Sequence, residues 1–360
     1  MEATRRSVLS TALLSGLCGC SAIRGQRNQL KWSARVGDDP IAEKIYVDDD
    51  RVAISTPTGR IALFRTRSGE SVIEERSREH LGNYAGTPPV AVSNLYLTFT
   101  DRVYAITKSG EVSWVEELPT DGFVSVASRP LVIDDDIYIT TDNGVVLRVN
   151  PDNRSITELD FPPIPANWWN FDNRRAVIGT ESLRTVVVDF TDEEVLWSCS
   201  GPPRDYPSFY NSDIITSTKR DDQLIVQRVD PDASEIRWNT PIPGTGISFS
   251  GQLSSETIAV VSRYPWEREE PSHATLIDAA SGEITDSYEL APRTNSSGEI
   301  SQGSLFLTSV AGDVVSINTE NGLTQHIQSE SQISSPATEH NGWVFFATNE
   351  GDIRSHSLDR

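Results

Sequence analysis

A pattern of about 40 residues recurs along nearly the whole chain and constrains its fold more than any other feature. Each copy contains an apolar segment, a polar turn, a second apolar segment, another turn, and a third segment that sometimes carries tryptophan. One position of the second turn recurs as Arg65, Ile106, Asn150, Asp189, Asp230, Asp278, Asn318 and Asp359. A period of this length is typical of β-propellers, in which each copy forms one blade.

The pattern inside each copy predicts strands and no helices. Apolar and polar residues alternate with a period of two, as in half-buried antiparallel strands. Short segments such as PPVAV and RPLVI precede the copies and supply a fourth, innermost strand. The fold class predicted from these features is all-β, an eight-bladed β-propeller of four-stranded antiparallel blades.

The last copy is incomplete, because the chain ends where its outermost strand is expected to begin. At the other end, Asn28 to Val36 resembles the outer strands of other copies, and Trp32 takes the place held there by Trp114, Trp197 and Trp238. We expect this N-terminal strand to complete the last blade and close the ring, which removes exposed sheet edges.

The first residues differ from the rest of the chain. Arg5 and Arg6 precede an apolar run from Val8 to Leu17, which is too short for a membrane-spanning helix. The paired arginines resemble a twin-arginine export signal. The sequence Leu-Cys-Gly-Cys that ends at Cys20 resembles a prokaryotic lipobox, whose last cysteine receives the lipid. We therefore predict a signal peptide over residues 1–19, a lipid-anchored linker over 20–27 and the propeller domain over 28–360.

The chain is strongly acidic, with 52 Asp and Glu against 31 Lys and Arg and a formal charge of −21. Such a surface repels nucleic acid, because phosphate binding needs clustered cations. Only four of the basic residues are lysines. Both features suit a protein of a halophile, where salt screens the carboxylates. The alternative is an ordinary acidic secreted protein.

Cysteine usage limits the covalent chemistry of the processed chain. Removal of residues 1–19 leaves Cys20, assigned to the lipid, and Cys199. No intramolecular disulfide is then possible, and Cys199 follows the apparent strand segment EVLW, so we expect an inert, buried thiol.

Three of the copies identify a family resemblance. The segments IDAASGEI, VDPDASEIRW and VDFTDEEVLW resemble the pyrroloquinoline-quinone-type propeller repeat, Ala-x-Asp-x-x-x-Gly-x-x-x-Trp. Asp278 and Gly282 keep the Asp and Gly, whereas Glu193 and Ser234 replace the glycine in two other copies. The resemblance implies that Trp32, Trp114, Trp197 and Trp238 dock neighbouring blades.

The same resemblance implies two different functions. Its lipoprotein branch, which includes the propeller subunit of the outer-membrane barrel assembly machinery, uses the ring as an interaction scaffold. We therefore expect a monomeric, non-enzymatic scaffold without cofactor, anchored by lipid on Cys20 to the outer face of the cytoplasmic membrane, with an unidentified protein partner. The alternative is a quinoprotein-like enzyme, or a binder of a small ligand or glycan, that uses the central channel. Against the enzyme, the chain has no adjacent cysteine pair and no assignable calcium triad.

No catalytic or metal-binding motif is recognisable. The five histidines are scattered, and neither a Gly-x-Ser-x-Gly elbow nor a glycine-rich phosphate loop is present. The aspartate runs at residues 48–50 and 134–136 lack the spacing of a calcium loop, so we interpret them as solvated turns.

Two irregular stretches are candidates for partner contact. Trp168 and Trp169 fall in PPIPANWWNFDN, interpreted as a loop at one propeller face, and Tyr264 and Trp266 fall in a long hairpin tip. Paired aromatic residues can anchor a partner, but they can equally cover the core, and the hairpin can be a tolerated insertion. Asn153 and Asn295 begin candidate glycosylation sequons.

Overall fold

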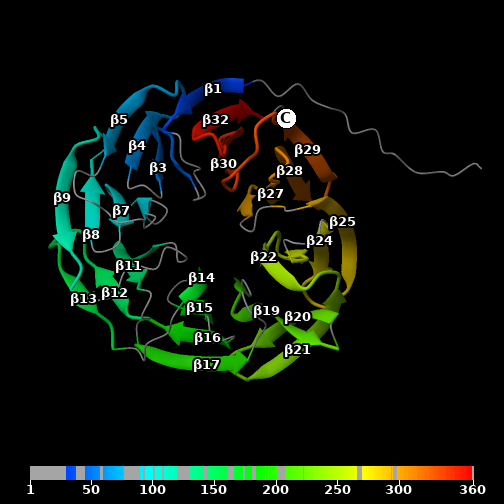
Figure 1. The fold of residues 1–360 in the computed structure, drawn as a ribbon. Helices are drawn as coiled ribbons and strands as arrows, with labels where there is room; N and C mark the ends of the chain where they lie inside the picture. Colours follow the sequence, from blue (N-terminus) through cyan, green and yellow to red (C-terminus); the bar gives the residue numbers. More distant parts are fainter. Residues whose placement is uncertain are drawn as a thin grey trace, which may run out of the picture.

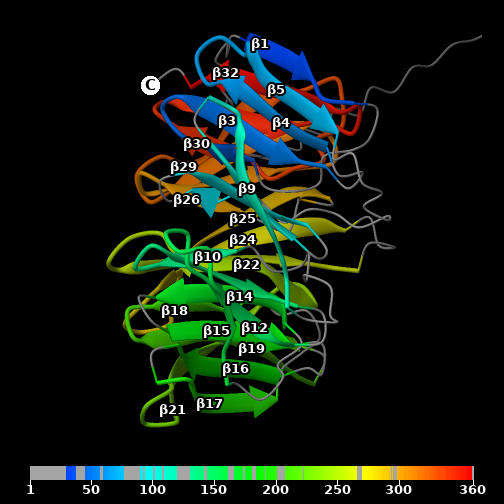
Figure 2. The same ribbon diagram turned by 90° about the vertical axis from the view of Figure 1, so that its left-hand side faces the viewer.

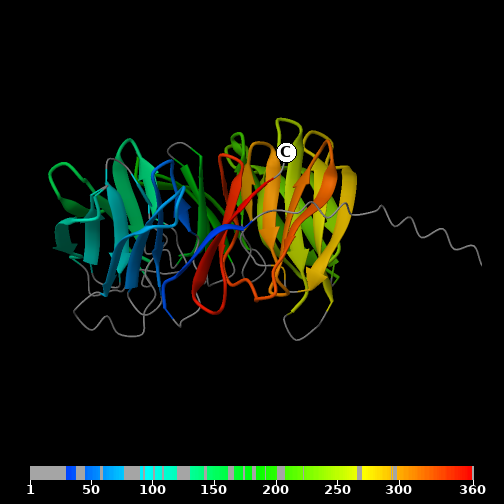
Figure 3. The same cartoon turned by 90° about the horizontal axis from the view of Figure 1, so that it is seen from above.

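The computed structural model describes residues 30–37, 45–56, 60–76, 90–91, 94–99, 102–107, 109–119, 130–141, 144–160, 166–172, 175–180, 184–190, 192–200, 207–221, 223–265, 270–292, 294 and 298–358. These residues form a ring of four-stranded antiparallel sheets around a central axis (Figure 1). Seen from its edge, the ring is a disc whose strands run between the two faces (Figure 3).

Seven sheets each consist of four consecutive strands, which follow one another from the centre of the ring outwards. The first three are β2 (Tyr46–Val47), β3 (Arg51–Ser55), β4 (Arg60–Arg65) and β5 (Ser71–Arg76); β6 (Val90–Ala91), β7 (Leu95–Phe99), β8 (Arg102–Ile106) and β9 (Val112–Glu117); and β10 (Leu131–Ile133), β11 (Asp136–Thr140), β12 (Val146–Val149) and β13 (Ile156–Glu158). The next two are β14 (Ala166–Asp172), β15 (Arg175–Thr180), β16 (Arg184–Asp189) and β17 (Glu194–Ser200); and β18 (Ser208–Tyr210), β19 (Asp213–Arg220), β20 (Gln223–Asp230) and β21 (Glu235–Ile242). The last two are β22 (Gly246–Gln252), β23 (Thr257–Arg263), β24 (Pro271–Asp278) and β25 (Ile284–Pro292); and β26 (Glu299–Ser301), β27 (Ser304–Thr308), β28 (Asp313–Asn318) and β29 (Gly322–Gln328).

One further sheet combines the two ends of the described chain, and it brings the number of four-stranded sheets among the described residues to eight. Its strands are β30 (Thr338–His340), β31 (Trp343–Ala347), β32 (Asp352–Ser357) and, outermost, β1 (Leu30–Arg35). β1 pairs antiparallel with β32, with Ser33 opposite Arg354. Figures 1 and 2 show β1 beside β32, so pairing between distant parts of the sequence closes the ring.

The second turn of each copy explains the recurring aspartate or asparagine. The Asp278 carboxylate accepts hydrogen bonds from the backbone N–H of Ala280 and Ser281 at 3.1 and 2.7 Å. Asn150, Asp230 and Asn318 make the same pair of contacts two and three residues ahead. These side chains fix the turn between the third and fourth strands, as Asx turns do.

Seven copies have a positive φ four residues after this repeat position, which is Asp or Asn in five of them and Arg65 or Ile106 in the other two. Glycine occupies the later position as Gly69, Gly110, Gly282 and Gly322, whereas Arg154, Glu193 and Ser234 adopt φ values of 61°, 50° and 54°. A side chain in this left-handed region costs about 1–2 kcal/mol. The repeat therefore demands the backbone shape of glycine even where the sequence has lost the glycine.

The core lies between the sheets and is built by their second and third strands. β3 is buried along its whole length, and β31 is buried except at Trp343. The largest fully buried side chains include Phe345, Phe346 and Leu63. By contrast, the exposed large apolar residues of the described part all lie on outermost strands: Leu30, Val112, Val115, Val195, Ile236, Ile284 and Leu323.

Candidate functional site

Several predicted site residues lie outside the part of the chain that the structure describes, namely Arg5, Arg6, Cys20, Trp266 and Asn295. The predicted signal peptide and linker lie there too. Among the described residues, no helix has the length and apolar character needed to cross a membrane.

Trp168 and Trp169 do not lie on a loop, so that part of the sequence interpretation is wrong. They belong to β14, the innermost strand of its sheet, where Trp169 pairs with Ile178 and Trp168 with Gly179 of β15. Beyond Pro165 the segment contains neither glycine nor proline, and a strand at this place completes the four-stranded sheet. Their role in partner contact stays a prediction.

Tyr264 lies in a surface depression, whereas Asn153 lies in an exposed turn. Tyr264 follows β23 and lines an open depression of about 880 Å³ together with Lys219, Asp221 and Pro243. Its ring packs edge-on against the His273 imidazole, with the two ring centroids 6.3 Å apart. Asn153 lies exposed in the turn between β12 and β13, where its side-chain oxygen accepts a hydrogen bond from the Ser155 N–H.

Trp32 and Trp238 connect neighbouring sheets through the same geometry. The Trp32 indole Nε1 donates to the Thr66 carbonyl at 2.9 Å, and that of Trp238 donates to the Ala279 carbonyl at 2.9 Å. Both acceptors directly follow the repeat position of Asp278. Each indole thus crosses from the outermost strand of one sheet to the second turn of the next.

The other two tryptophans also lie on outermost strands. Trp114 of β9 is buried and packs in a core cluster with Ile137, Leu147 and Val149 of the next sheet. Trp197 of β17 is half-buried and packs against a cluster that contains Phe209 and Ile214 of the next sheet.

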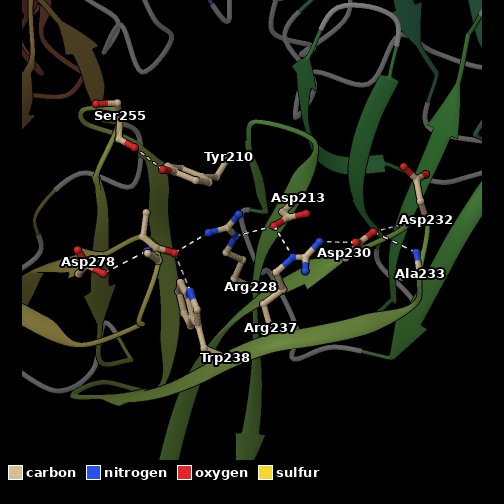
Figure 4. Close-up of polar contacts among 12 residues, drawn as sticks. Tyr210, Asp213, Arg228, Asp230, Asp232, Ala233, Arg237, Trp238, Ser255 and Asp278 are labelled. Atoms are coloured by element: carbon tan, nitrogen blue, oxygen red, sulfur yellow. Dashed lines mark hydrogen bonds and ion pairs between the residues drawn. The ribbon is translucent and has the colours of Figure 1, made fainter.

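The seam after β21 also contains a network of ion pairs (Figure 4). The Asp213 carboxylate, only 4% exposed, accepts from Nε of Arg228 at 2.6 Å and from Nε of Arg237 at 3.1 Å. Arg228 lies over the Tyr210 ring at 4.7 Å and donates to the Ala279 carbonyl at 2.6 Å. The guanidinium therefore joins its own sheet to the next one.

Arg237 extends this network to the second turn, since it donates to the Asp230 carboxylate at 2.5 Å. The Ala233 N–H bond, and secondarily the charge of Arg237, hold the pKa of Asp230 below its ordinary value. The carboxylates and guanidiniums of this network neutralise one another and stabilise the seam after β21. We assign the network no catalytic role.

The described histidines do not form a catalytic or metal-binding cluster. His326 contacts the Ser316 hydroxyl at 2.7 Å and stacks on Phe306, whereas His340 contacts the Asp49 carboxylate at 2.9 Å. Across the described ranges, no three His, Cys, Asp or Glu side chains are grouped so that they could hold a metal ion. Cys199 of β17 is half-buried and not in a disulfide, so the prediction of a buried thiol is wrong.

A groove that the sequence interpretation missed lies on the seam between β25 and β29, which Figure 1 places side by side on the rim. We call it the seam groove. It encloses about 590 Å³ and is lined by Tyr288, Glu289, Leu290, Ala291, Thr294, Thr308, Ser309, Asp313, Val315, Asn321, Gly322, Leu323 and Gln325. The sequence signal is weak: the segment GEITDSYEL lacks the tryptophan that Trp114, Trp197 and Trp238 supply in three other copies, but the copies with GESVIEE, NRSITEL and NGLTQHIQ lack it too.

Comparisons with known proteins agree with this architecture. The family described as outer membrane protein assembly factor BamB matches residues 19–162, less than half of the chain. No curated protein sequence matches the chain.

Solved structures resemble the whole ring. BamB from Moraxella catarrhalis has 13% sequence identity and a TM-score of 0.66, covering 92% of this chain and 100% of that one. The Dos1 propeller has 11% identity and a TM-score of 0.70, covering 93% of this chain and 96% of that one. The designed protein Ika8 has 10% identity and a TM-score of 0.69, covering 92% and 100%. At such low sequence identity, structural similarity shows the fold alone. Together with the partial family match, it supports a PQQ-like β-propeller.

Proposed function

We propose that the chain is an exported, lipid-anchored β-propeller that acts as a protein-interaction or assembly scaffold at the outer face of the membrane. The observation that carries the proposal is the closed ring itself, in which the ends of the chain share one sheet. Two of its seams contain a buried indole that is hydrogen-bonded to the next sheet, and another seam contains a groove. The partial match to an assembly factor supports the same function.

A ring of this kind suits a scaffold for a physical reason. Pairing of β1 with β32 covers the edge that β32 would otherwise expose and ties the first described strand to the last sheet. The faces and rim then present side chains from a fixed backbone, and binding to a rigid surface loses little conformational entropy. The formal charge of −21 disfavours nucleic acid as the partner.

Membrane attachment in this proposal depends on Cys20, with Arg5 and Arg6 directing export. Residues 1–19 are removed, 20–27 act as the linker, and 28–360 form a monomeric ring. The acidic surface and scarcity of lysine support a high-salt environment, in which the Debye length falls to about 3 Å at 1 M salt.

Cell fractionation tests the anchor with a matched pair of variants. Cys20→Ser is expected to move the protein from the membrane fraction to the soluble fraction, with an unchanged thermal midpoint. Cys18→Ser, two residues earlier, is expected to stay in the membrane fraction. Equal membrane association of both variants would exclude Cys20 as the attachment point.

The scaffold role is tested by crosslinking the native, membrane-attached protein and identifying what is captured. A stoichiometric protein partner is expected. A chain that captures no protein but reduces dyes after addition of pyrroloquinoline quinone and Ca²⁺ would overturn the proposal in favour of an enzyme.

A further inference from the structure

The seam groove lies where one repeat position has changed its residue. In the β18–β21 sheet, Trp238 stands opposite Arg228, which lies two residues before Asp230. In the β22–β25 sheet, Asp286 stands opposite Leu276, which lies two residues before Asp278. Asp286 therefore holds the repeat position of Trp238.

The preceding seam contains an indole that this seam lacks. Trp238 is 8% exposed and fills the seam in front of the next sheet, where a Cβ on Gly282 would lie only 2.8 Å from its ring. Asp286, by contrast, is exposed. Its short, charged side chain cannot supply the apolar surface of an indole. The seam between β25 and β29 therefore lacks the indole of the preceding seam, as do the seams after β5, β13 and β29, where Ile73, Thr157 and Thr324 hold this position.

Tyr288 forms one wall of the seam groove. It occupies the repeat position of Thr240, since each stands opposite the residue four before the turn aspartate. Its ring is half-buried, and its hydroxyl lies 3.0 Å from where a Cβ on Gly322 would be. Burial, and secondarily the charge of Asp286, raise the pKa of the Tyr288 phenol above its ordinary value.

Apolar surface and negative charge are combined in the groove. Leu290 and Val315 line it, and Leu323 is 38% exposed at its side. Among the described lining residues the charged ones are both carboxylates, Glu289 of β25 and Asp313 of β28. The Asp313 carboxylate is held in place by Gln325 at 2.7 Å and Ser309 at 2.9 Å, while Glu289 is exposed.

We propose that the seam groove binds a segment of a partner protein that presents an aromatic side chain next to lysine or arginine. The aromatic ring of the partner occupies the seam groove, as the Trp238 indole of this chain occupies the preceding seam. The cation pairs with Glu289 and Asp313, and aromatic anchors seated in such pockets carry most of the energy of many interfaces. This inference rests on the proposed scaffold function and gives the chemistry of its partner.

The test is a fluorescence-anisotropy titration of the purified full-length chain with three labelled peptides. The first is Gly-Ser-Arg-Trp-Lys-Ser-Gly, the second replaces its Trp by Ala, and the third replaces its Arg and Lys by Glu. The first peptide is expected to bind at least about tenfold more tightly than either of the others. Equal affinity for all three peptides would overturn the proposal.

Three variants of the chain locate the site. Asp286→Trp restores the indole in cis and is expected to weaken binding of the first peptide at least about tenfold, with an unchanged or raised thermal midpoint. Glu289→Lys is expected to weaken it by a similar factor, whereas Glu235→Lys, a matched change on the neighbouring outer strand β21, is expected to leave it unchanged. If Asp286→Trp does not fold, Leu323→Glu takes its place.

Failure of this inference can be told apart from failure of the scaffold proposal. If the native chain and the Asp286→Trp variant capture the same membrane partner equally, the scaffold stands and the groove is not its contact site. If neither captures a partner, the scaffold proposal fails, and the peptide titration alone decides the groove.

Discussion

Gly282 lies directly under the indole of Trp238, so closely that a Cβ placed on it would come within 2.8 Å of two ring atoms. Its φ of +77° is also one that other residues rarely adopt. The glycine of one sheet and the tryptophan of the preceding sheet are therefore a single docking unit.

The docking unit is tested by comparing the stability of Gly282→Ala with that of a control variant, Gly303→Ala. Gly303 has a similar φ of +71°, but nothing lies within 4 Å of its missing Cβ. Gly303→Ala is therefore expected to lower the free energy of unfolding by about 1 kcal/mol through the backbone alone. Gly282→Ala is expected to cost about 1–2 kcal/mol more, because the indole must move. Denaturant titration measures both, and equal losses would contradict direct contact.

Trp32→Ala is expected to destabilise the ring by about 3–5 kcal/mol, because it removes a buried aromatic side chain from the core. Trp32 packs with Phe64 of one sheet and Phe345 of another. Deletion of residues 28–36 should be worse, since it also removes the β1–β32 ladder and exposes an edge. A deletion variant with the thermal midpoint and solubility of the intact chain, in matched high salt, would show that β1 does not close the ring.

Glu193→Gly and Ser234→Gly are expected to stabilise the protein. Both residues have positive φ values, 50° and 54°, at the position where other copies have glycine. Relief of this strain exceeds the added entropy of the unfolded chain, so each change should raise the free energy of unfolding by up to about 1 kcal/mol. Thermal unfolding checks this, and a lowered midpoint in both variants would show that the native turn is not strained.

Asp213→Ala is expected to lower the free energy of unfolding by about 3–5 kcal/mol, because it leaves Arg228 without its carboxylate partner in the seam. Arg228→Met in the same background should recover part of the loss, since no uncompensated cation then remains. Chemical denaturation of the two single variants and the double variant gives the coupling energy. Strictly additive effects would argue against a coupled pair.

His326 is expected to make the protein less stable in mild acid. Burial lowers the pKa of its imidazole below the ordinary value of 6.5. The unfolded chain therefore binds a proton more readily than the folded one, so the free energy of unfolding falls as the pH drops through 6.5 and below. Wild type should lose more stability than His326→Gln between pH 7.5 and 5.5, and parallel stability curves of the two proteins would contradict this.

Much of this structure is determined locally by the sequence. Strand alternation, the aspartate or asparagine of the second turn and the glycine after it act through contacts within a few residues. Each copy therefore displays the alternation and at least one of the two turn residues. The likeness of Asn28–Val36 to other outer strands likewise anticipates the pairing of β1 with β32.

The tertiary structure alone decided what happens between sheets. The strand that holds Trp168 and Trp169 is selected because β15 needs an inner partner to complete a four-stranded sheet, and this requirement overrides the proline-rich appearance of the preceding segment. The network of Asp213, Arg228 and Arg237 depends on the register of β19, β20 and β21. The seam groove is lined by residues of two different sheets, among them Tyr288 of β25 and Asp313 of β28, next to a position where the preceding sheet has Trp238 and this one has Asp286. The sequence shows which residue differs between the copies, but the volume of the seam groove depends on how the two sheets pack against each other.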